Sequence, residues 1–339
     1  MRGPLAALAA AIYGAVVRHR NRRFDRGKGV ITFDRPVISV GNLSVGGTGK
    51  TPMVAYLVRL LREHGFFPCI AMRGYGRPAG KGLDSDEASL YRRQFPDIPI
   101  VAQPNRAAGL IELFASEQGA RVDSIILDDG FQHRRIARQA DIVLIDATRP
   151  PFNDKLLPAG WLREPVESIR RAHAAVITHA EAVTRTDAIE LETQLWPLLP
   201  RSVVAVCRHA WTGLAVGDEV VGIDWLRGKR LYAACAIGNP GPFLAAAHNA
   251  AGGLVGATVL RDHANFAHEE VRGLVASLRD HQAEALIVTE KDWSKLAHLP
   301  PETWPCPLVR PVLNLTFDRH ESELQQLVLS TVRLFKDED

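Results

Sequence analysis

The sequence predicts an α/β protein: a mostly parallel sheet sandwiched by helices, with a second, smaller α/β domain joined by a two-stranded ribbon. Three observations lead to this fold class. Apolar runs of four to six residues alternate with helical or polar stretches. These runs have almost no polar positions, as in parallel strands that are covered on both faces. The first run leads into a glycine-rich loop and then a helix.

Short runs predict the elements of the first domain. Pro52–Leu61 has the spacing of a helix, and the other runs are typical of buried strands. The predicted strands are Val37–Val40, Phe67–Met72, Ile98–Ala102, Ser124–Leu127, Ile142–Ile145 and Ala175–Thr178. The helical or polar stretches between them are expected to be crossover connections, which parallel strands require.

The pattern repeats in a second unit, with strands expected at Leu231–Ala236, Val255–Leu260 and Ala285–Val288. The runs Val203–Val206 and Leu308–Leu313 flank it and predict the ribbon, after which the helix Glu321–Phe335 returns to the first domain. The expected divisions are an N-terminal arm at 1–30, a first domain at 31–200 completed by 315–339, and the ribbon with the smaller domain at 201–314.

The charge is unevenly distributed. The 339 residues carry a net charge of +3, but residues 1–30 hold seven bases and one acid, a net charge of +6. The remaining 309 residues therefore sum to −3. A mildly acidic body argues against a general nucleic-acid binder, which needs a basic stripe across its fold. The four cysteines form no CxxC pair, which argues against a zinc site or a disulfide framework.

The N-terminal arm begins with an uncharged stretch, Pro4–Val17, of 14 residues. As a helix it would be about 21 Å long, too short for a hydrocarbon core of about 30 Å. Most of the basic residues follow this stretch, whereas a signal peptide has its charge in front. Two interpretations remain open: a helix that lies in the interface of an anionic membrane, or one that packs on the protein's own body.

The strongest motif is the glycine-rich loop, which follows a predicted strand and opens a predicted helix. Its residues are Ser44, Val45, Gly46, Gly47, Thr48, Gly49, Lys50 and Thr51. Backbone N–H groups of such a loop cradle phosphates, and the helix N-terminus adds its positive dipole end. Lys50 would reach the β- and γ-phosphates, and Thr51 would ligate Mg²⁺. The loop departs from the usual pattern at Ser44, where glycine is common. It predicts nucleotide binding.

Three classes of nucleotide-binding protein fit such a loop. A GTPase needs a base-reading motif, and Thr289–Asp292 has its lysine one position late for it. Partition ATPases carry a lysine where this chain has Val45. A kinase for a small or lipid acceptor needs neither feature.

Acidic residues follow the predicted strand Ser124–Leu127. Asp128 and Asp129 are hard oxygen ligands at a strand end, which favours an Mg²⁺ role over a simple Asp-Gly turn. The cluster Asp84–Glu87, the segment Arg73–Arg77 and the pair Asp262–His263 are not decisive by themselves.

Taken together, these motifs resemble those of the tetraacyldisaccharide 4′-kinase family, the lipid A 4′-kinases. The resemblance covers nearly the whole chain in family order, and its segments are Gly41–Pro52, Arg73–Arg77, Ser85–Glu87, Asp128–His133, Leu156–Pro165, Ile237–Pro240, Asp262–His263 and Thr289–Asp292. In this family the loop commonly starts with Ser or Thr, so Ser44 agrees with the family pattern.

The resemblance implies a sheet of the P-loop kinase type, and a kinase that uses ATP and Mg²⁺ to phosphorylate the 4′-hydroxyl of a tetraacylated glucosamine disaccharide 1-phosphate. It implies Asp86 as the base, supported by His263, with Lys50 as a third catalytic residue. Glu87, Asp128 and Asp129 would help Thr51 to hold the metal. The implied substrate residues are Tyr75, Arg77, Arg106, Gln132, Arg163 and Glu164.

The resemblance also implies peripheral or monotopic binding to the cytoplasmic face of the inner membrane through the N-terminal helix. We expect anionic lipid as the surface, a lipid A precursor as the partner, and no nucleic acid or required protein partner. Because Asp86 and His263 belong to different predicted domains, their meeting would require domain closure. The alternatives are a P-loop switch or chaperone ATPase that acts on a protein, and, more weakly supported, a membrane adaptor without activity.

Overall fold

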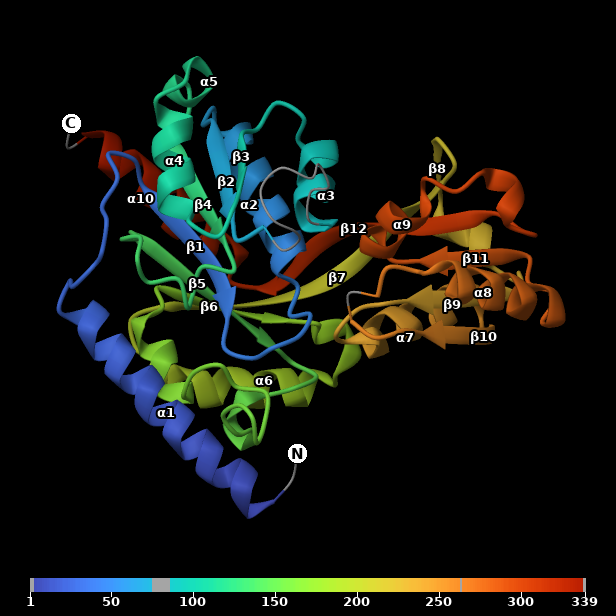
Figure 1. The fold of residues 1–339 in the computed structure, drawn as a ribbon, viewed down its shortest axis with the longest axis horizontal. Helices are drawn as coiled ribbons and strands as arrows, with labels where there is room; N and C mark the ends of the chain where they lie inside the picture. Colours follow the sequence, from blue (N-terminus) through green and yellow to red (C-terminus); the bar gives the residue numbers. More distant parts are fainter. Residues whose placement is uncertain (1–2, 75–85, 263, 338–339) are drawn as a thin grey trace. The chain divides into compact units, whose positions relative to one another are not determined.

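The structure, a computed structural model, describes residues 3–74, 86–262 and 264–337 (Figure 1). The chain divides into two compact units, Met1–Arg208 with Leu315–Asp339, and His209–Asn314. Both units contain parallel strands and helices, and the predicted α/β fold class is confirmed.

The first unit is built on a parallel sheet with the strand order β7-β6-β5-β1-β4-β2-β3. The strands are β1 Val37–Asn42, β2 Pro68–Met72, β3 Ile100–Ala102, β4 Ser124–Asp128, β5 Ala140–Asp146, β6 Ala174–Thr178 and the start of β7 Val203–Val216. All residues of β1, β4, β5 and β6 are buried, which explains their unbroken apolar sequences. The strand β1 lies between β5 and β4, so the loop that follows it emerges near the middle of the sheet.

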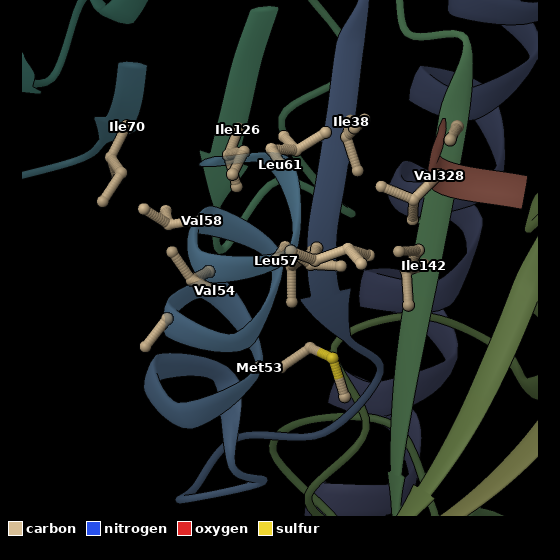
Figure 2. Packing of buried hydrophobic residues seen from close by; sticks show 14 of the residues in the cluster. Ile38, Met53, Val54, Leu57, Val58, Leu61, Ile70, Ile126, Ile142 and Val328 are labelled. Carbon is tan, nitrogen blue, oxygen red and sulfur yellow. The ribbon is translucent and has the colours of Figure 1, made fainter. Parts of the chain in front are cut away.

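Helices cover both faces of this sheet. The α-helices of this unit are α1 Pro4–Asp25, α2 Lys50–Glu63, α3 Asp86–Gln94, α4 Arg106–Phe114, α5 Glu117–Ala120, α6 Arg185–Leu195 and α10 Glu321–Asp337. Alternate strand residues face opposite layers. Ile142 packs with Leu57 of α2 and Val328 of α10 (Figure 2), whereas its neighbour Val143 belongs to the cluster that contains Leu191 of α6.

The second unit contains the parallel strands β9 Leu231–Cys235, β10 Leu254–Val259 and β11 Ala285–Val288, in the order β10-β9-β11. Its other elements are β8 Glu219–Val221, α7 Pro240–Ala251, α8 His268–Asp280 and α9 Glu290–Leu296. The strands β7 and β12 (Leu308–Arg319) are neighbours in the sheet order and continue from one unit into the other. Both extend several residues beyond the runs that predicted them.

The segment Thr289–Asp292, set aside as a base-reading motif, begins the helix α9. The Thr289 side chain accepts a hydrogen bond from the Asp292 N–H, as a helix N-cap does. The carboxylate of Asp292 is buried and accepts hydrogen bonds from Thr289 Oγ1 and the Ala236 N–H. These contacts give the motif a structural role in the second unit.

The helix α1 is longer than the apolar stretch that predicted it. It continues through the basic cluster to Asp25, because arginine is a good helix former. Ala6, Ala10, Gly14 and Val17 face the body and are buried. A Cβ atom at Gly14 would lie 2.7 Å from Leu156 Cδ1, so glycine permits this close approach.

The opposite face of α1 exposes a stripe of large apolar side chains. Leu5, Leu8, Ile12 and Val16 are between 60% and 79% exposed. The buried face agrees with a helix that packs on the protein's own body, and the exposed face agrees with a helix that lies in a membrane interface. Within the described ranges, no helix is both long enough and apolar enough to span a membrane.

Candidate active site

The glycine-rich loop lies between β1 and α2, at the carboxyl end of the parallel strands, where ligands bind in open α/β sheets. Gly46 and Gly49 have φ values of 121° and 80°, which side chains other than glycine rarely adopt. The Val45 N–H donates a 2.9 Å hydrogen bond to the Trp161 carbonyl, and Ser44 forms an antiparallel bridge with Leu162. The segment around Trp161 therefore supports the loop from one side.

The loop is also supported from the end of β6. Thr48 is buried, and its carbonyl accepts a 3.1 Å hydrogen bond from Thr178 Oγ1. Lys50 is the first residue of α2, so its ammonium group and the helix N-terminus both lie at the loop. This arrangement can bind the phosphates of a nucleotide.

Asp129 follows β4 and is the centre of a cluster of positive charges. Lys50 Nζ lies 3.7 Å from Asp129 Oδ1, and Arg163 Nη1 donates to both carboxylate oxygens, at 2.9 and 3.0 Å. Arg106, nearly fully buried at the start of α4, donates to the Asp129 carbonyl. Burial alone would raise the pKa of Asp129, but Lys50 and Arg163 outweigh it and hold the pKa below its usual range. Asp129 is therefore a paired carboxylate.

Asp128, the last residue of β4, is in a different environment. Its side chain is almost fully buried and accepts a 3.0 Å hydrogen bond from the hydroxyl of Tyr91 on α3. Burial raises the pKa of Asp128 to about 6, against the opposing effect of Lys50. Its second oxygen, Oδ1, is buried and has no hydrogen-bond partner among the described residues.

The donors near Asp128 fit a magnesium ion. A buried carboxylate oxygen without a partner calls for a cation or a donor, and Mg²⁺ prefers oxygen ligands. Thr51, in the first turn of α2, supplies a hydroxyl that interacts with Tyr91. Asp128 and Thr51 are the metal residues that this arrangement supports best, because both oxygens of Asp129 are already bonded to Arg163.

The segment after Asp129 packs closely against the end of β1. A Cβ atom at Gly41 would lie 2.5 Å from Phe131, so this position requires glycine. Gln132 Nε2 donates to the Asn42 carbonyl at 2.8 Å, and Gln132 Oε1 accepts a long hydrogen bond, 3.4 Å, from Arg163. Gln132 thereby connects β1 to the Arg163 segment.

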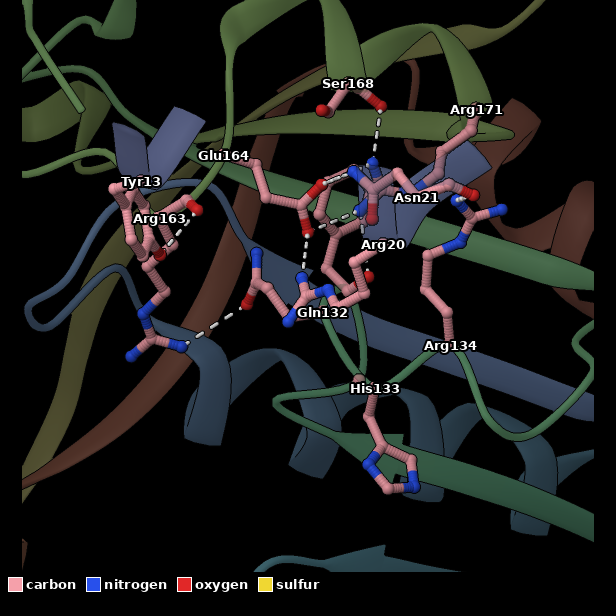
Figure 3. A network of polar contacts seen from close by, with 12 residues as sticks. Tyr13, Arg20, Asn21, Gln132, His133, Arg134, Arg163, Glu164, Ser168 and Arg171 are labelled. Carbon is pink, nitrogen blue, oxygen red and sulfur yellow. Dashed lines mark hydrogen bonds and ion pairs between the residues drawn. The ribbon is translucent and has the colours of Figure 1, made fainter. Parts of the chain in front are cut away.

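Glu164 is a predicted substrate residue whose side chain is fully buried. Its carboxylate is bound by Arg171 and by residues of α1 (Figure 3). These contacts occupy both of its oxygens.

The structure brings together most of the predicted residues of the first unit. Those that gather around the loop are Lys50, Thr51, Arg106, Asp128, Asp129, Gln132 and Arg163. Asp86 is the first residue of α3, and its backbone position is described. Glu87 follows it and contributes to the pKa of Asp128. The predicted residues Tyr75, Arg77 and His263 lie outside the described residues.

Sequence reasoning missed two residues near the loop. Tyr91 is fully buried, and a lone tyrosine on a helix gives no signal that it reaches Asp128. His179 follows β6 directly, so its position at a strand end was the available signal. Burial lowers the pKa of His179, but its hydrogen bond to Glu181 and the charge of Asp146 raise it above its usual value.

Comparison with known proteins matches most of the chain to one family. A family model described as Tetraacyldisaccharide-1-P 4′-kinase matches residues 3–333. A tetraacyldisaccharide 4′-kinase of Geobacter sulfurreducens is 38% identical over 321 residues, with 88% of this chain and 85% of the relative covered. One of Chlorobium limicola is 34% identical, with 86% and 87% covered.

A solved structure is similar along nearly all of the chain. It is the "apo" form of LpxK from Aquifex aeolicus in complex with ATP, which is 28% identical with a TM-score of 0.71. The similarity covers 96% of this chain and 98% of that one.

Proposed function

Because the chain belongs to the tetraacyldisaccharide-1-P 4′-kinase family, we propose that the residues around its glycine-rich loop carry out phosphoryl transfer from ATP to a lipid acceptor. The chain is an ATP-dependent kinase of lipid A biosynthesis, which phosphorylates an alcohol group, the 4′-hydroxyl of a tetraacyldisaccharide 1-phosphate. The observation that carries the assignment of residues is the contact of Lys50 with Asp129 at the end of the parallel sheet.

Phosphoryl transfer asks the protein mainly to position groups and to neutralise charge. The N–H groups of the loop and Lys50 bind the β- and γ-phosphates of ATP. Arg163 and Arg106 add positive charge beside Asp129. This charge compensates the Asp129 carboxylate and so reduces its repulsion of the triphosphate.

Magnesium is assigned to Thr51 and Asp128, with Glu87 and Asp129 as nearby acids. When bound, the ion neutralises charge on the phosphate oxygens. The orphaned Oδ1 of Asp128 supports this assignment. Tyr91 donates to the other oxygen of the same carboxylate and fixes its orientation.

We assign Asp86 as the base that takes the proton of the 4′-hydroxyl. A sugar hydroxyl is too weak an acid to ionise beforehand, and a carboxylate can accept its proton as the new P–O bond forms. Asp86 is the first residue of α3, and the same helix carries Tyr91 to Asp128. The family resemblance adds His263 as its support, and Tyr75 and Arg77 as substrate residues.

We assign the exposed stripe of α1 to the surface of the inner membrane on its cytoplasmic side. Leu8 and Ile12 project away from the body, and the same helix carries a basic cluster beyond Val17. An apolar face next to bases suits the interface of an anionic bilayer, where each base contributes about 1 kcal/mol. A lipid acceptor makes such a location useful, because the substrate lies in that surface.

One assay tests the proposed function. The purified chain is incubated with γ-labelled ATP, Mg²⁺ and a tetraacylated disaccharide 1-phosphate in detergent. Transfer of the label to the lipid is expected. Hydrolysis of ATP without labelled lipid would instead support a switch or chaperone ATPase.

A further inference from the structure

We propose that the buried Glu164 carboxylate joins α1 to the active site, so that docking of α1 on the body sets the position of Arg163 against Asp129. Glu164 and Asn21 are then positioning residues for the reaction. The inference rests on the proposed function for the importance of Arg163 and Asp129, but the joint itself can be measured without substrate.

The carboxylate of Glu164 is held from two directions. On the body side, Arg171 binds both of its oxygens, at 2.9 and 3.1 Å. On the helix side, Asn21 Nδ2 donates to Oε2 at 2.7 Å, and Arg20 Nη2 lies 3.6 Å from Oε1 (Figure 3). A fully buried carboxylate is stable only when it is paired in this way. The loss of α1 would remove one side of the pairing.

The neighbouring residue carries the contact into the active site. Arg163 is adjacent to Glu164, and its carbonyl accepts a 2.9 Å hydrogen bond from the hydroxyl of Tyr13 on α1. The Arg163 side chain binds Asp129, which in turn lies 3.7 Å from Lys50. The helix thus holds the backbone at Arg163, whereas the side chain acts on the catalytic centre.

A second route leads from α1 to the segment that contains Asp129. Arg171, which binds Glu164, also donates to the Phe131 carbonyl and stacks at 3.6 Å from the Phe131 ring. Arg134 donates to the Asn21 carbonyl and pairs with Asp25 at the end of α1. The segment that contains Arg163 and the segment that follows Asp129 are therefore both held by contacts with α1.

The two faces of α1 connect a lipid surface with the active site. The outer stripe, which includes Leu8 and Ile12, is available to a lipid surface, and the inner face holds the active-site segments. A helix held at a lipid surface would therefore keep Arg163 in contact with Asp129 while the enzyme acts at that surface.

The test compares variants of the full-length chain in detergent. Asn21→Ala removes the hydrogen bond from α1 to Glu164 and leaves the pair of Glu164 with Arg171 intact, and Glu164→Gln removes the charge. His19→Ala is the control, since His19 is exposed on the same helix. The measurements are kcat, the KM for ATP, the melting temperature, and hydrogen–deuterium exchange of 4–25 and 161–165.

We expect Asn21→Ala and Glu164→Gln each to speed exchange in both segments and to lower kcat roughly tenfold, because a hydrogen bond to a buried charge is lost. The kcat of the variant with both changes should be no lower than that of Glu164→Gln alone, because both changes disrupt the same connection between α1 and Arg163. The KM for ATP and the kcat of His19→Ala should stay unchanged.

Three results would overturn the inference. They are unchanged exchange of residues 4–25 in Asn21→Ala, faster exchange without loss of kcat, and losses in the double variant that multiply as for independent sites. If Glu164→Gln does not fold, Asn21→Ala decides alone. If the wild-type chain transfers no phosphate, the proposed function fails, and exchange of 161–165 in Asn21→Ala still decides whether the joint exists.

Discussion

Arg163 Nη1 lies 2.9 Å from Oδ1 and 3.0 Å from Oδ2 of Asp129. The same carboxylate is 3.7 Å from Lys50 Nζ, so the two cations share one anion. Because Arg163 makes the shorter contacts, it neutralises Asp129 and leaves the Lys50 ammonium available for a phosphate. We therefore propose that the Arg163–Asp129 pair weakens the hold of Asp129 on Lys50, so that Lys50 can bind ATP.

Replacing Arg163 by glutamine tests this relationship. Without the guanidinium, Asp129 should draw Lys50 closer, so we expect the KM for ATP to rise and kcat to fall, each about tenfold, as for the loss of a charge-assisted hydrogen bond. Steady-state kinetics with ATP varied at saturating acceptor measure both. A rise in the KM for the acceptor alone would instead mean that Arg163 acts only on the acceptor.

Replacing Lys50 by alanine should remove a donor that stabilises charge developing on the phosphates. We expect kcat to fall on the order of 10²- to 10³-fold, as when one preorganised donor is lost. Arg62→Ala is the matched control, because Arg62 lies in the last turn of α2 and pairs with the half-exposed Asp97. Such surface pairs contribute about 0–1 kcal/mol. Full activity of Lys50→Ala would exclude the glycine-rich loop as the phosphate site.

The proposed base is tested by Asp86→Ala. If Asp86 accepts the hydroxyl proton, kcat should fall by about 10²- to 10⁴-fold, the usual contribution of general base catalysis. Binding of ATP, followed by calorimetry without acceptor, should be nearly unaffected. An unchanged kcat would remove Asp86 from this role.

The fold could be predicted because its signals are local. An apolar strand, a glycine-rich loop and a helix follow one another within Val37–Leu61, and positive φ values at Gly46 and Gly49 explain the glycines. Asp128 and Asp129 can be predicted for the same reason, since Asp128 ends a buried strand and Asp129 follows it.

The features that the sequence could not predict depend on contacts between residues far apart in the chain. No local pattern distinguishes Glu164, bound by Asn21 across 143 positions, from an acid that lines a cleft. Tyr91 on α3 likewise reaches Asp128 at the end of β4 across 37 positions. The end of α1 was underestimated because hydrophobicity stops at Val17, whereas helix propensity continues through the arginines.

The membrane surface is tested by placing charges on the outer stripe of α1. The double variant Leu8→Glu and Ile12→Glu should bind anionic vesicles more weakly, because carboxylates oppose both burial in the interface and attraction to anionic lipid. The inner face of α1 is left intact. Sedimentation with vesicles of anionic and neutral lipid measures the effect. Ile111→Glu, which alters an exposed apolar residue of α4, is the control. Equal sedimentation of the double variant and the control would place the membrane contact elsewhere.

His133 links stability to pH. Burial, together with the positive charges of Arg106 and Arg138, lowers the pKa of His133 to about 4. The unfolded chain takes up this proton near pH 6.5, so between these values it binds a proton that the folded chain excludes. This group therefore makes the folded state less stable as pH falls from about 6.5 toward about 4. His133→Gln removes the effect, so acidification from about pH 7.5 to about pH 5 should lower its urea midpoint less than that of the wild type. Equal losses in the two proteins would show that His133 titrates normally in the folded chain.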